Sequence, residues 1–511
     1  MNTATSPFHS TVVLHPGDAN LASLKAAFQA ETIQVSEDGW MQVRAAHDFL
    51  LEVVASGRTV YGVNTGFGSL ADCAIEADDL CALQRNLLLS HACGTGEPLG
   101  ADVVRRMLIL KVHGLIRGHS GVAPATVERL LAHLNAGVLP VVPRQGSLGA
   151  SGDLAPLAHL CLPLLGEGEV VLNGEVVASK VALEELGWPA LELGPKEGLA
   201  LINGTQMMSS LLGHGVERLE RLWEWAAAIG SLSHAAYQGL EAAFHPGAHE
   251  VRGHDGQIQA AAALRGWLDG AQYTKQDRQW VQDPYCLRCM PQVHGAVKAA
   301  IEYGQATFVA EATAVTDNPI LLPASKEVLS AGNFHGEPLA LVLDHLKVAA
   351  AELGSISERR SYKLLGGHRG LPAFLVANPG LHSGLMIVQY TAASIVSRNK
   401  SRAVPASTDT IDSSNGQEDH VSMGANAAVQ LHELLPEVQQ VLALELLTAS
   451  QALTFRERAG KGAQLSPQQK QLLDAFRAEV PPSDEDVFMS PLMAAAQRFV
   501  GNHSLNAPAR T

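Results

Sequence analysis

Five long segments with helical periodicity constrain the fold of this chain more than any other feature. In each of them apolar residues recur at spacings of three and four, as they do on the buried face of a helix. The segments are residues 102–117, 206–244, 341–365, 385–400 and 427–458. The longest are roughly two to three times the usual helix length, so we expect an elongated helical bundle.

The first part of the chain has a different pattern. Short β-branched runs at Ser10–Leu14 and Thr59–Tyr61 alternate with short helical pieces and with a glycine-rich stretch, Gly62–Gly68. This pattern is typical of a small α/β region. The sequence therefore predicts a mainly α protein with two regions. The first is a mixed α/β region at residues 1–115 that carries the glycine-rich loop, and the second is an elongated helical-bundle region at residues 116–511.

The charge balance argues against nucleic acids and anionic membranes as partners. The chain has 36 Lys and Arg but 51 Asp and Glu, and its net charge of −15 would repel phosphate groups. The N-terminal residues lack the basic and apolar segments of a secretory signal. The longest uncharged stretch, Gly370–Ser397, contains Asn378-Pro379-Gly380 and His382, which do not fit a membrane span. We expect a cytoplasmic protein.

The second of the long helical segments is apolar on more than one face. Its apolar residues include Leu222, Trp223, Trp225, Ala226, Ile229 and Leu232. A single chain would not easily cover all of these side chains. We therefore expect the protein to self-associate.

The most informative segment is a loop of small residues that leads into an apolar helical pattern, residues 146–160. Three interpretations of Ala150-Ser151-Gly152-Asp153 compete. Ser151 or Asp153 could cap the helix that follows. Ser151 could be a nucleophile, although the hydrolase elbow needs Gly-x-Ser-x-Gly after a strand, and Gly152 follows Ser151 directly. In the third interpretation the backbone cyclises, because the nitrogen of Gly152 attacks the carbonyl carbon of Ala150.

The residue types suit this cyclisation. Glycine at position 152 leaves the attacking nitrogen unhindered and lets the loop fold back on itself. Loss of one water on ring closure, and of a second from the hydroxyl of Ser151, leaves a five-membered ring with an exocyclic methylidene. Ala150 is small enough for the compressed turn, and Asp153 is placed to assist proton removal. The product is an electrophilic cofactor that the chain makes itself, with no external cofactor.

Residues 146–160 resemble the signature of the aromatic amino acid ammonia-lyase family, whose members carry a 4-methylidene-imidazol-5-one ring made from Ala-Ser-Gly. The resemblance extends from about Val12 to Arg458 in several separate motifs, and it is closest to the histidine-specific branch. It implies the ammonia-lyase, fumarase/aspartase-like architecture. It also implies a homotetramer in which active-site motifs of different subunits meet.

Three further motifs gain a role through this resemblance. Taken alone, Tyr61 is an incidental residue of a glycine-rich loop, and Asn203 could cap the helix that follows it. The resemblance implies that Tyr61 lies on a lid and removes the β-proton of the substrate. It implies that Asn203 bonds to the ring and to the substrate amine, and that Phe334 packs against the active site and steadies the ring.

A fourth motif presents an amide, a phenol and a guanidinium together. Gln282, Tyr285 and Arg288 are spaced to share one side of a helical turn, and an arginine can bind a carboxylate through two parallel bonds. The resemblance implies that Arg288 holds the α-carboxylate of the substrate and that Gln282 and Tyr285 line the ring, with Tyr285 among the catalytic groups. Because Cys286-x-x-Cys289 lacks a second ligand pair at finger spacing, we expect no metal.

The resemblance also implies the substrate. A lone histidine at a helix end, such as His91, is usually structural, and a charged run such as the one around Glu418 is usually a solvated face. In the histidine-specific branch, however, their counterparts lie near the imidazole and amine of the substrate. The resemblance therefore implies elimination of ammonia from L-histidine to give trans-urocanate. A tyrosine or phenylalanine ammonia-lyase, or an aminomutase with the same ring, is the alternative within the family, and a purely structural helical bundle is the alternative outside it.

Overall fold

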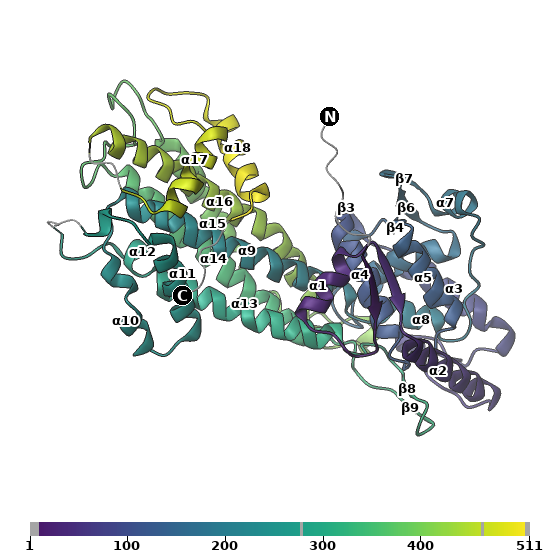
Figure 1. Ribbon diagram of the computed structural model, residues 1–511. Coiled ribbons are helices and arrows are strands. Elements are labelled where there is room, and N and C mark those ends of the chain that lie inside the picture. Colours follow the sequence, from purple (N-terminus) through teal and green to yellow (C-terminus); the bar gives the residue numbers. More distant parts are fainter. Residues whose placement is uncertain (1–9, 276–279, 461–463, 506–511) are drawn as a thin grey trace. The chain divides into compact units, whose positions relative to one another are not determined.

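The computed structural model is mainly helical (Figure 1) and describes residues 10–275, 280–460 and 464–505. Contacts within the chain group the described residues into two compact units. The first unit draws on Met1–His214, Gln305–Leu343 and Pro405–Val429, and the second draws on Gly215–Gly304, Asp344–Val404 and Gln430–Thr511. The mainly α class predicted from the sequence is confirmed.

Four of the five boundaries between the two units lie inside the longest helices, and the fifth lies between Val404 and Pro405. These helices are α9 (Gln206–Ala236), α13 (Met290–Ala312), α14 (Glu337–Leu365) and α16 (Gly424–Arg458). Each of them contributes residues to both units, so this division differs from the one expected after residue 115. Residues 62–68 and 146–153, the two loops singled out in the sequence, both belong to the first unit.

The first unit combines helices of ordinary length with small sheets. Strands β1 (Thr11–Leu14) and β2 (Thr32–Val35) pair in parallel, with Thr11 opposite Thr32. Antiparallel pairs join β3 (Thr95–Pro98) to β5 (Pro143–Gln145), β6 (Glu169–Leu172) to β4 (Leu139–Pro140) and β7 (Glu175–Ala178), and β8 (Ile320–Leu322) to β9 (Glu327–Leu329). Its helices include α1 (Leu21–Gln29), α2 (Glu37–Ala55), α3 (Leu80–His91), α4 (Ala101–Leu115), α5 (Pro124–Asn135), α6 (Leu154–Cys161), α7 (Ser179–Leu186) and α8 (Glu197–Ile202).

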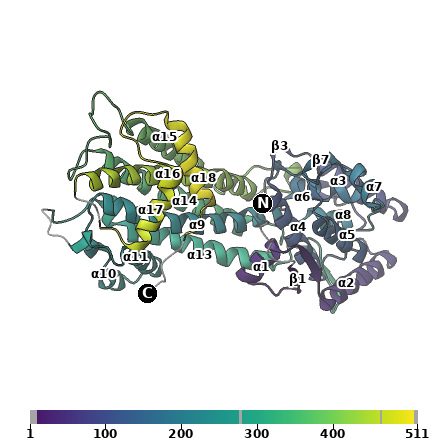
Figure 2. The same ribbon diagram turned by 45° about the horizontal axis from the view of Figure 1, so that its top comes forward.

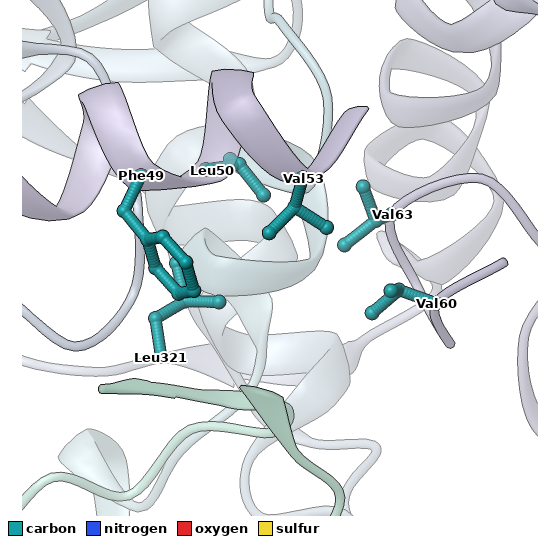
Figure 3. Packing of buried hydrophobic residues seen from close by; sticks show 6 residues of the cluster. All are labelled: Phe49, Leu50, Val53, Val60, Val63 and Leu321. Atoms are coloured by element: carbon teal, nitrogen blue, oxygen red, sulfur yellow. The ribbon is translucent and has the colours of Figure 1, made fainter. Parts of the chain in front are cut away.

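The strand expected at Thr59–Tyr61 does not form, and the chain turns there instead. The side chain of Asn64 accepts the Val60 N–H over 2.8 Å, and the Val60 carbonyl accepts the Val63 N–H over 3.1 Å. The prediction was wrong because this local bonding competes with strand pairing. Val60 and Val63 instead pack into a buried cluster with Phe49, Leu50, Val53 and Leu321 (Figure 3). The start of the glycine-rich loop is thereby anchored in the core.

The second unit is built around parts of the four long helices. In both views α9, α13, α14 and α16 run side by side there (Figures 1 and 2). Gly304 of α13 lies so close to Val216 of α9 and Leu346 of α14 that an added Cβ would crowd both side chains. The unit also contains α10 (Pro246–Glu250), α11 (Asp255–Leu268), α12 (Tyr285–Arg288), α15 (Met386–Arg402), α17 (Pro467–Glu479) and α18 (Met489–Asn502). Of the helices in the described ranges, none is both long and apolar enough for a membrane span.

The helix predicted for residues 206–244 ends earlier, at Ala236. Gln238 adopts a left-handed conformation with φ 54°, and the Gly239 N–H donates to the His234 carbonyl over 2.8 Å. This bonding closes the helix end. The prediction missed it because glycine is the residue that normally occupies the left-handed position, whereas a glutamine does so here.

The expectation that one chain would leave a face of α9 uncovered was also wrong. The apolar residues that motivated it are all buried: Leu222, Trp223, Trp225, Ala226, Ile229 and Leu232. The Trp223 indole N–H donates to the His294 carbonyl of α13 over 2.8 Å, and Trp225 packs edge-on against Phe499 of α18. Because neighbouring helices cover α9 on several sides, its apolar faces are no argument for self-association.

Candidate active site

Residues 146–153, here called the tripeptide loop, connect β5 to α6 and fold back on themselves. Ser147 Oγ donates to the Gly152 carbonyl oxygen over 3.1 Å and accepts the Gly149 N–H over 3.0 Å. Gly152 has φ +77° and lies directly against Gly204, where a Cβ would collide with the Gly204 carbonyl. Position 152 therefore accepts only glycine, which is the residue that the cyclisation requires.

The hydroxyl of Ser151 bonds to a carboxylate. Ser151 Oγ donates to Glu418 Oε1 over 3.0 Å, and the second oxygen of Glu418 accepts Ser413 Oγ over 3.0 Å. The Ser151 carbonyl accepts Asn203 Nδ2 over 3.3 Å. The fold thus brings together Ser151, Asn203 and Glu418, which the sequence assigned to one site, although 267 positions separate Ser151 from Glu418.

Capping of α6, the helix that follows, does not account for the polar residues of this loop. Helix α6 begins at Leu154, and Asp153 at its N-cap makes no capping hydrogen bond with its side chain. Asp153 Oδ2 instead accepts the N–H groups of Met207 and Met208, at the start of α9, over 2.9 and 3.0 Å. The hydrolase alternative also loses support, because the Ser151 hydroxyl is bonded to a carboxylate rather than to a histidine base.

Asp153 has the environment of a proton acceptor. Its side chain is fully buried, and loss of hydration raises the pKa of its carboxyl to about 7, although the two backbone N–H bonds oppose this shift. Its Oδ1 has no hydrogen-bond partner among the described residues. A carboxyl that titrates near neutrality, with one oxygen free, can accept the protons released during ring closure.

Two cavities meet at the tripeptide loop. Their volumes are about 550 and 580 Å³. Both are lined by Tyr61, Ser151, Asn203 and Glu418. The first cavity also contacts His91, and the second contacts Ala150 and Phe334. Each of these residues was predicted for the site, and all of them belong to the first unit.

His91 is held as a hydrogen-bond acceptor toward the first cavity. It is the last residue of α3, and its Nδ1 lies 2.9 Å from the Leu87 carbonyl oxygen. A carbonyl can only accept, so Nδ1 carries the proton and Nε2 remains free to accept. Burial lowers the pKa of His91, while the Leu87 carbonyl and the charge of Glu418 oppose the shift. The neutral imidazole can therefore receive an N–H donor from a ligand in this cavity.

Tyr61 is oriented by its own loop. The phenol oxygen accepts the Gly68 N–H over 3.2 Å, and this bond fixes the direction of the hydroxyl. Beyond Gly68, the Ser69 N–H donates to Ser414 Oγ over 3.4 Å. The loop is thus anchored in the core before Tyr61 and attached after it to the turn that precedes Glu418.

Asn203 offers an unused acceptor at the site. It is the C-cap of α8 and is 4% exposed. Its Nδ2 bonds to the Ser151 carbonyl, but its Oδ1 has no partner among the described residues. A buried amide oxygen normally has a hydrogen bond, so this atom is suited to accept one from a bound amine.

Several polar residues around these cavities have no recognisable signal in the sequence. Ser413, which fixes Glu418, lies in a turn with no recognisable motif. His335 donates through Nε2 to the His420 carbonyl over 3.1 Å, and the two imidazoles stack 6.0 Å apart beside Phe334. His420 lies in the charged run around Glu418, but its pairing with a residue on another segment had no local signal in the sequence.

Gln282, Tyr285 and Arg288 lie together in the second unit. Arg288 Nη1 donates to Gln282 Oε1 over 2.6 Å, and the guanidinium lies 4.7 Å from the centre of the Tyr285 ring. Gln282 precedes α12, whose N-cap is Pro284, so the three residues do not share one helical turn as expected. They line a cavity of their own and are not among the residues that line the two cavities at the tripeptide loop.

Comparisons with known proteins find relatives along nearly the whole chain. A family model described as aromatic amino acid lyase matches residues 20–478. The chain is 49% identical over 470 residues to the histidine ammonia-lyase of Symbiobacterium thermophilum, covering 91% of this chain and 92% of that protein. The crystal structure of histidine ammonia-lyase from Trypanosoma cruzi is similar, with a TM-score of 0.87 and 37% identity, covering 96% of this chain and 93% of that one. The tyrosine aminomutase of Streptomyces globisporus has a TM-score of 0.90 and 32% identity, covering 96% of both chains.

Proposed function

Since the chain belongs to the aromatic amino acid lyase family, we propose that it acts as a histidine ammonia-lyase, which converts L-histidine to trans-urocanate and ammonia. The observation that carries the proposal is the contact of Asn203 and Glu418 with Ser151 of the tripeptide loop, beside a cavity that His91 lines. Identity to histidine-directed relatives exceeds identity to the aminomutase, 49% against 32%.

The tripeptide loop fits the methylidene-imidazolone ring. Gly152 occupies a position where no side chain has room, and Ala150 is buried beside Val421 and Met423. Asp153 Oδ1 is free to accept protons as the ring closes. Once formed, the ring supplies an electron-poor double bond that makes the amino group of the substrate a better leaving group. The protein needs no other electrophile for this elimination.

The first cavity suits the imidazole of L-histidine. His91 Nε2 accepts the imidazole N–H, because Nδ1 already donates to Leu87. Glu418 provides a negative charge near the imidazole and the amine, and Asn203 Oδ1 accepts an N–H of the amine. Tyr61, which lines the same cavity, removes the β-proton. Phenylalanine, which would give cinnamate, has no ring N–H and would leave His91 without a hydrogen-bond donor.

A test of substrate choice compares the two product classes. We expect incubation with L-histidine to give the ultraviolet absorbance of urocanate, and incubation with phenylalanine or tyrosine to give far less cinnamate or coumarate. Exchange of His91 for Leu should raise KM for histidine more than it lowers kcat, because a hydrogen bond to the bound imidazole is lost. A larger kcat/KM on phenylalanine or tyrosine than on histidine would instead favour the lyase or aminomutase alternative.

The substrate carboxylate has its best partner in Arg288, which belongs to the second unit. We propose that Arg288, with Gln282 and Tyr285, completes the active site of another subunit in a homotetramer. Tyr285 is 70% exposed, so it is available to a neighbouring chain. Exposed apolar residues on α14 and α15 also favour self-association: Val348, Tyr362, Ile387 and Tyr390.

Subunit complementation tests this shared site. The variants Ser151→Ala and Arg288→Met are each expected to be nearly inactive. When both are co-expressed and the mixed oligomers are purified, activity should return, because some sites then combine an intact tripeptide loop with an intact Arg288. Mixed tetramers without any regained activity, or a fully active monomer, would contradict the shared site.

A further inference from the structure

A lysine lies inside the apolar core close to the tripeptide loop. Lys111 is on α4 between Leu110 and Val112 and is only 2% exposed. Burying an ammonium is costly unless it is fully hydrogen-bonded. Burial also lowers the pKa of Lys111 to about 8. We therefore asked which groups the Lys111 ammonium binds in the core.

Both hydrogen bonds of Lys111 go to the end of one short helix. Its Nζ donates to the carbonyl oxygen of Ala200 over 3.0 Å and to that of Asn203 over 2.9 Å. Ala200 is in the last turn of α8, and Asn203 is its C-cap. Carbonyls at a helix C-terminus lack partners within the helix, and a cation there also complements the helix dipole. A helix as short as Glu197–Ile202 depends on such outside contacts.

The second buried lysine of this region has a different task. Lys196, at the N-cap of the same helix, forms an ion pair with Asp317 over 2.6 Å and donates to the Ser120 carbonyl. Lys196 therefore neutralises a buried carboxylate. Lys111, in contrast, donates its two hydrogen bonds to the backbone carbonyls of Ala200 and Asn203. It therefore fixes the backbone at the end of α8.

We propose that Lys111 is a positioning residue of the active site, which acts by holding the backbone of Asn203. With that backbone fixed, Asn203 Nδ2 stays on the Ser151 carbonyl and its free Oδ1 stays aimed at the amine of the substrate. This inference rests on the proposed function. A displacement of about 1 Å at such a group can cost on the order of 10²-fold in rate.

A double-mutant cycle tests the proposal. We expect Lys111→Met to lower kcat/KM for histidine by about 10- to 100-fold. In the Asn203→Ala background the same exchange should have almost no further effect, because the side chain that Lys111 positions is gone. Because Lys111 acts through Asn203, the two exchanges should affect ring formation alike. The fraction of protein that has lost two waters, measured by intact mass, should therefore be equal in Lys111→Met and Asn203→Ala. Losses that multiply in the double variant, or a Lys111→Met enzyme as active as the parent, would overturn the proposal.

Two further variants separate positioning from stability. Lys298→Met removes a lysine that pairs with Glu220 in the second unit and should lower the melting temperature while leaving kcat/KM near that of the parent. Lys111→Arg keeps a cation and its donors, and it should be more active than Lys111→Met. If Lys111→Met does not fold, Lys111→Gln, which removes the cation but keeps a polar side chain, forms the same cycle with Asn203→Ala. Failure of the parent to produce urocanate would refute the proposed function, whereas an additive cycle in an active parent refutes only the role of Lys111.

Discussion

Replacing Ser151 with alanine is expected to lower kcat on the order of 10³-fold or more while the protein still folds. The exchange removes the hydroxyl whose loss creates the double bond, so no electrophile can form. The bond from Ser151 Oγ to Glu418 is also absent from the parent once its ring has formed, and a single hydrogen bond contributes only about 1 kcal/mol, so we expect the variant to stay folded. Urocanate production measured against circular dichroism and melting temperature separates the two effects.

Ser413→Ala is the matched control for this variant. Ser413 donates to Glu418 over 3.0 Å, so its exchange disturbs the carboxylate beside the ring without changing the tripeptide itself. It leaves the ring-forming residues intact, and we expect it to keep activity within about tenfold of the parent. A Ser151→Ala enzyme that turns over as fast as Ser413→Ala would contradict the role of Ser151.

The second large effect is expected from Tyr61→Phe. Removing the phenol hydroxyl takes away the base for the β-proton and should lower kcat by about 10²- to 10⁴-fold, with little change in KM. The ring should still form, because Tyr61 is not part of the tripeptide loop. Steady-state kinetics on histidine and intact mass of the same sample measure both expectations.

Ser69→Ala tests whether the loss of kcat in Tyr61→Phe comes from a disordered loop rather than from the missing phenol hydroxyl. Ser69 Oγ accepts Asn415 Nδ2 over 3.4 Å, so this variant weakens the attachment of the loop without touching Tyr61. We expect a loss of less than about tenfold. Equal losses in the two variants would mean that Tyr61 acts by ordering the loop and not by accepting a proton.

The parts of the site that could be predicted from the sequence are those with a local chemical reason. Ala150-Ser151-Gly152 is defined by the cyclisation that only these small residues permit, and the fold adds that Gly152 has no room for a side chain. The long helices were also predictable, since α14 and α16 extend over the segments whose periodicity indicated them. In both cases the information lies within a few turns of chain.

What could not be predicted depends on contacts between distant segments. The chain from Ser413 through Glu418 to Ser151 needs a fold that brings position 418 to position 151. Lys111 could have been noticed as a single charge in an apolar helical run, but nothing in the run reveals that its partners are the carbonyls of Ala200 and Asn203. The burial of the apolar faces of α9 could not be predicted for the same reason. The helices that bury them come from later segments of the chain.

The central claim is that Ala150, Ser151 and Gly152 condense into the ring that drives elimination. Mass spectrometry of the tryptic peptide Gln145–Lys180 from active enzyme tests it most directly, since cleavage after Arg144 and Lys180 isolates the tripeptide loop. The account predicts that this peptide weighs less than its sequence requires by two water molecules, and that the Ser151→Ala peptide does not show this loss. A fully active enzyme whose peptide has the unmodified mass would contradict the account.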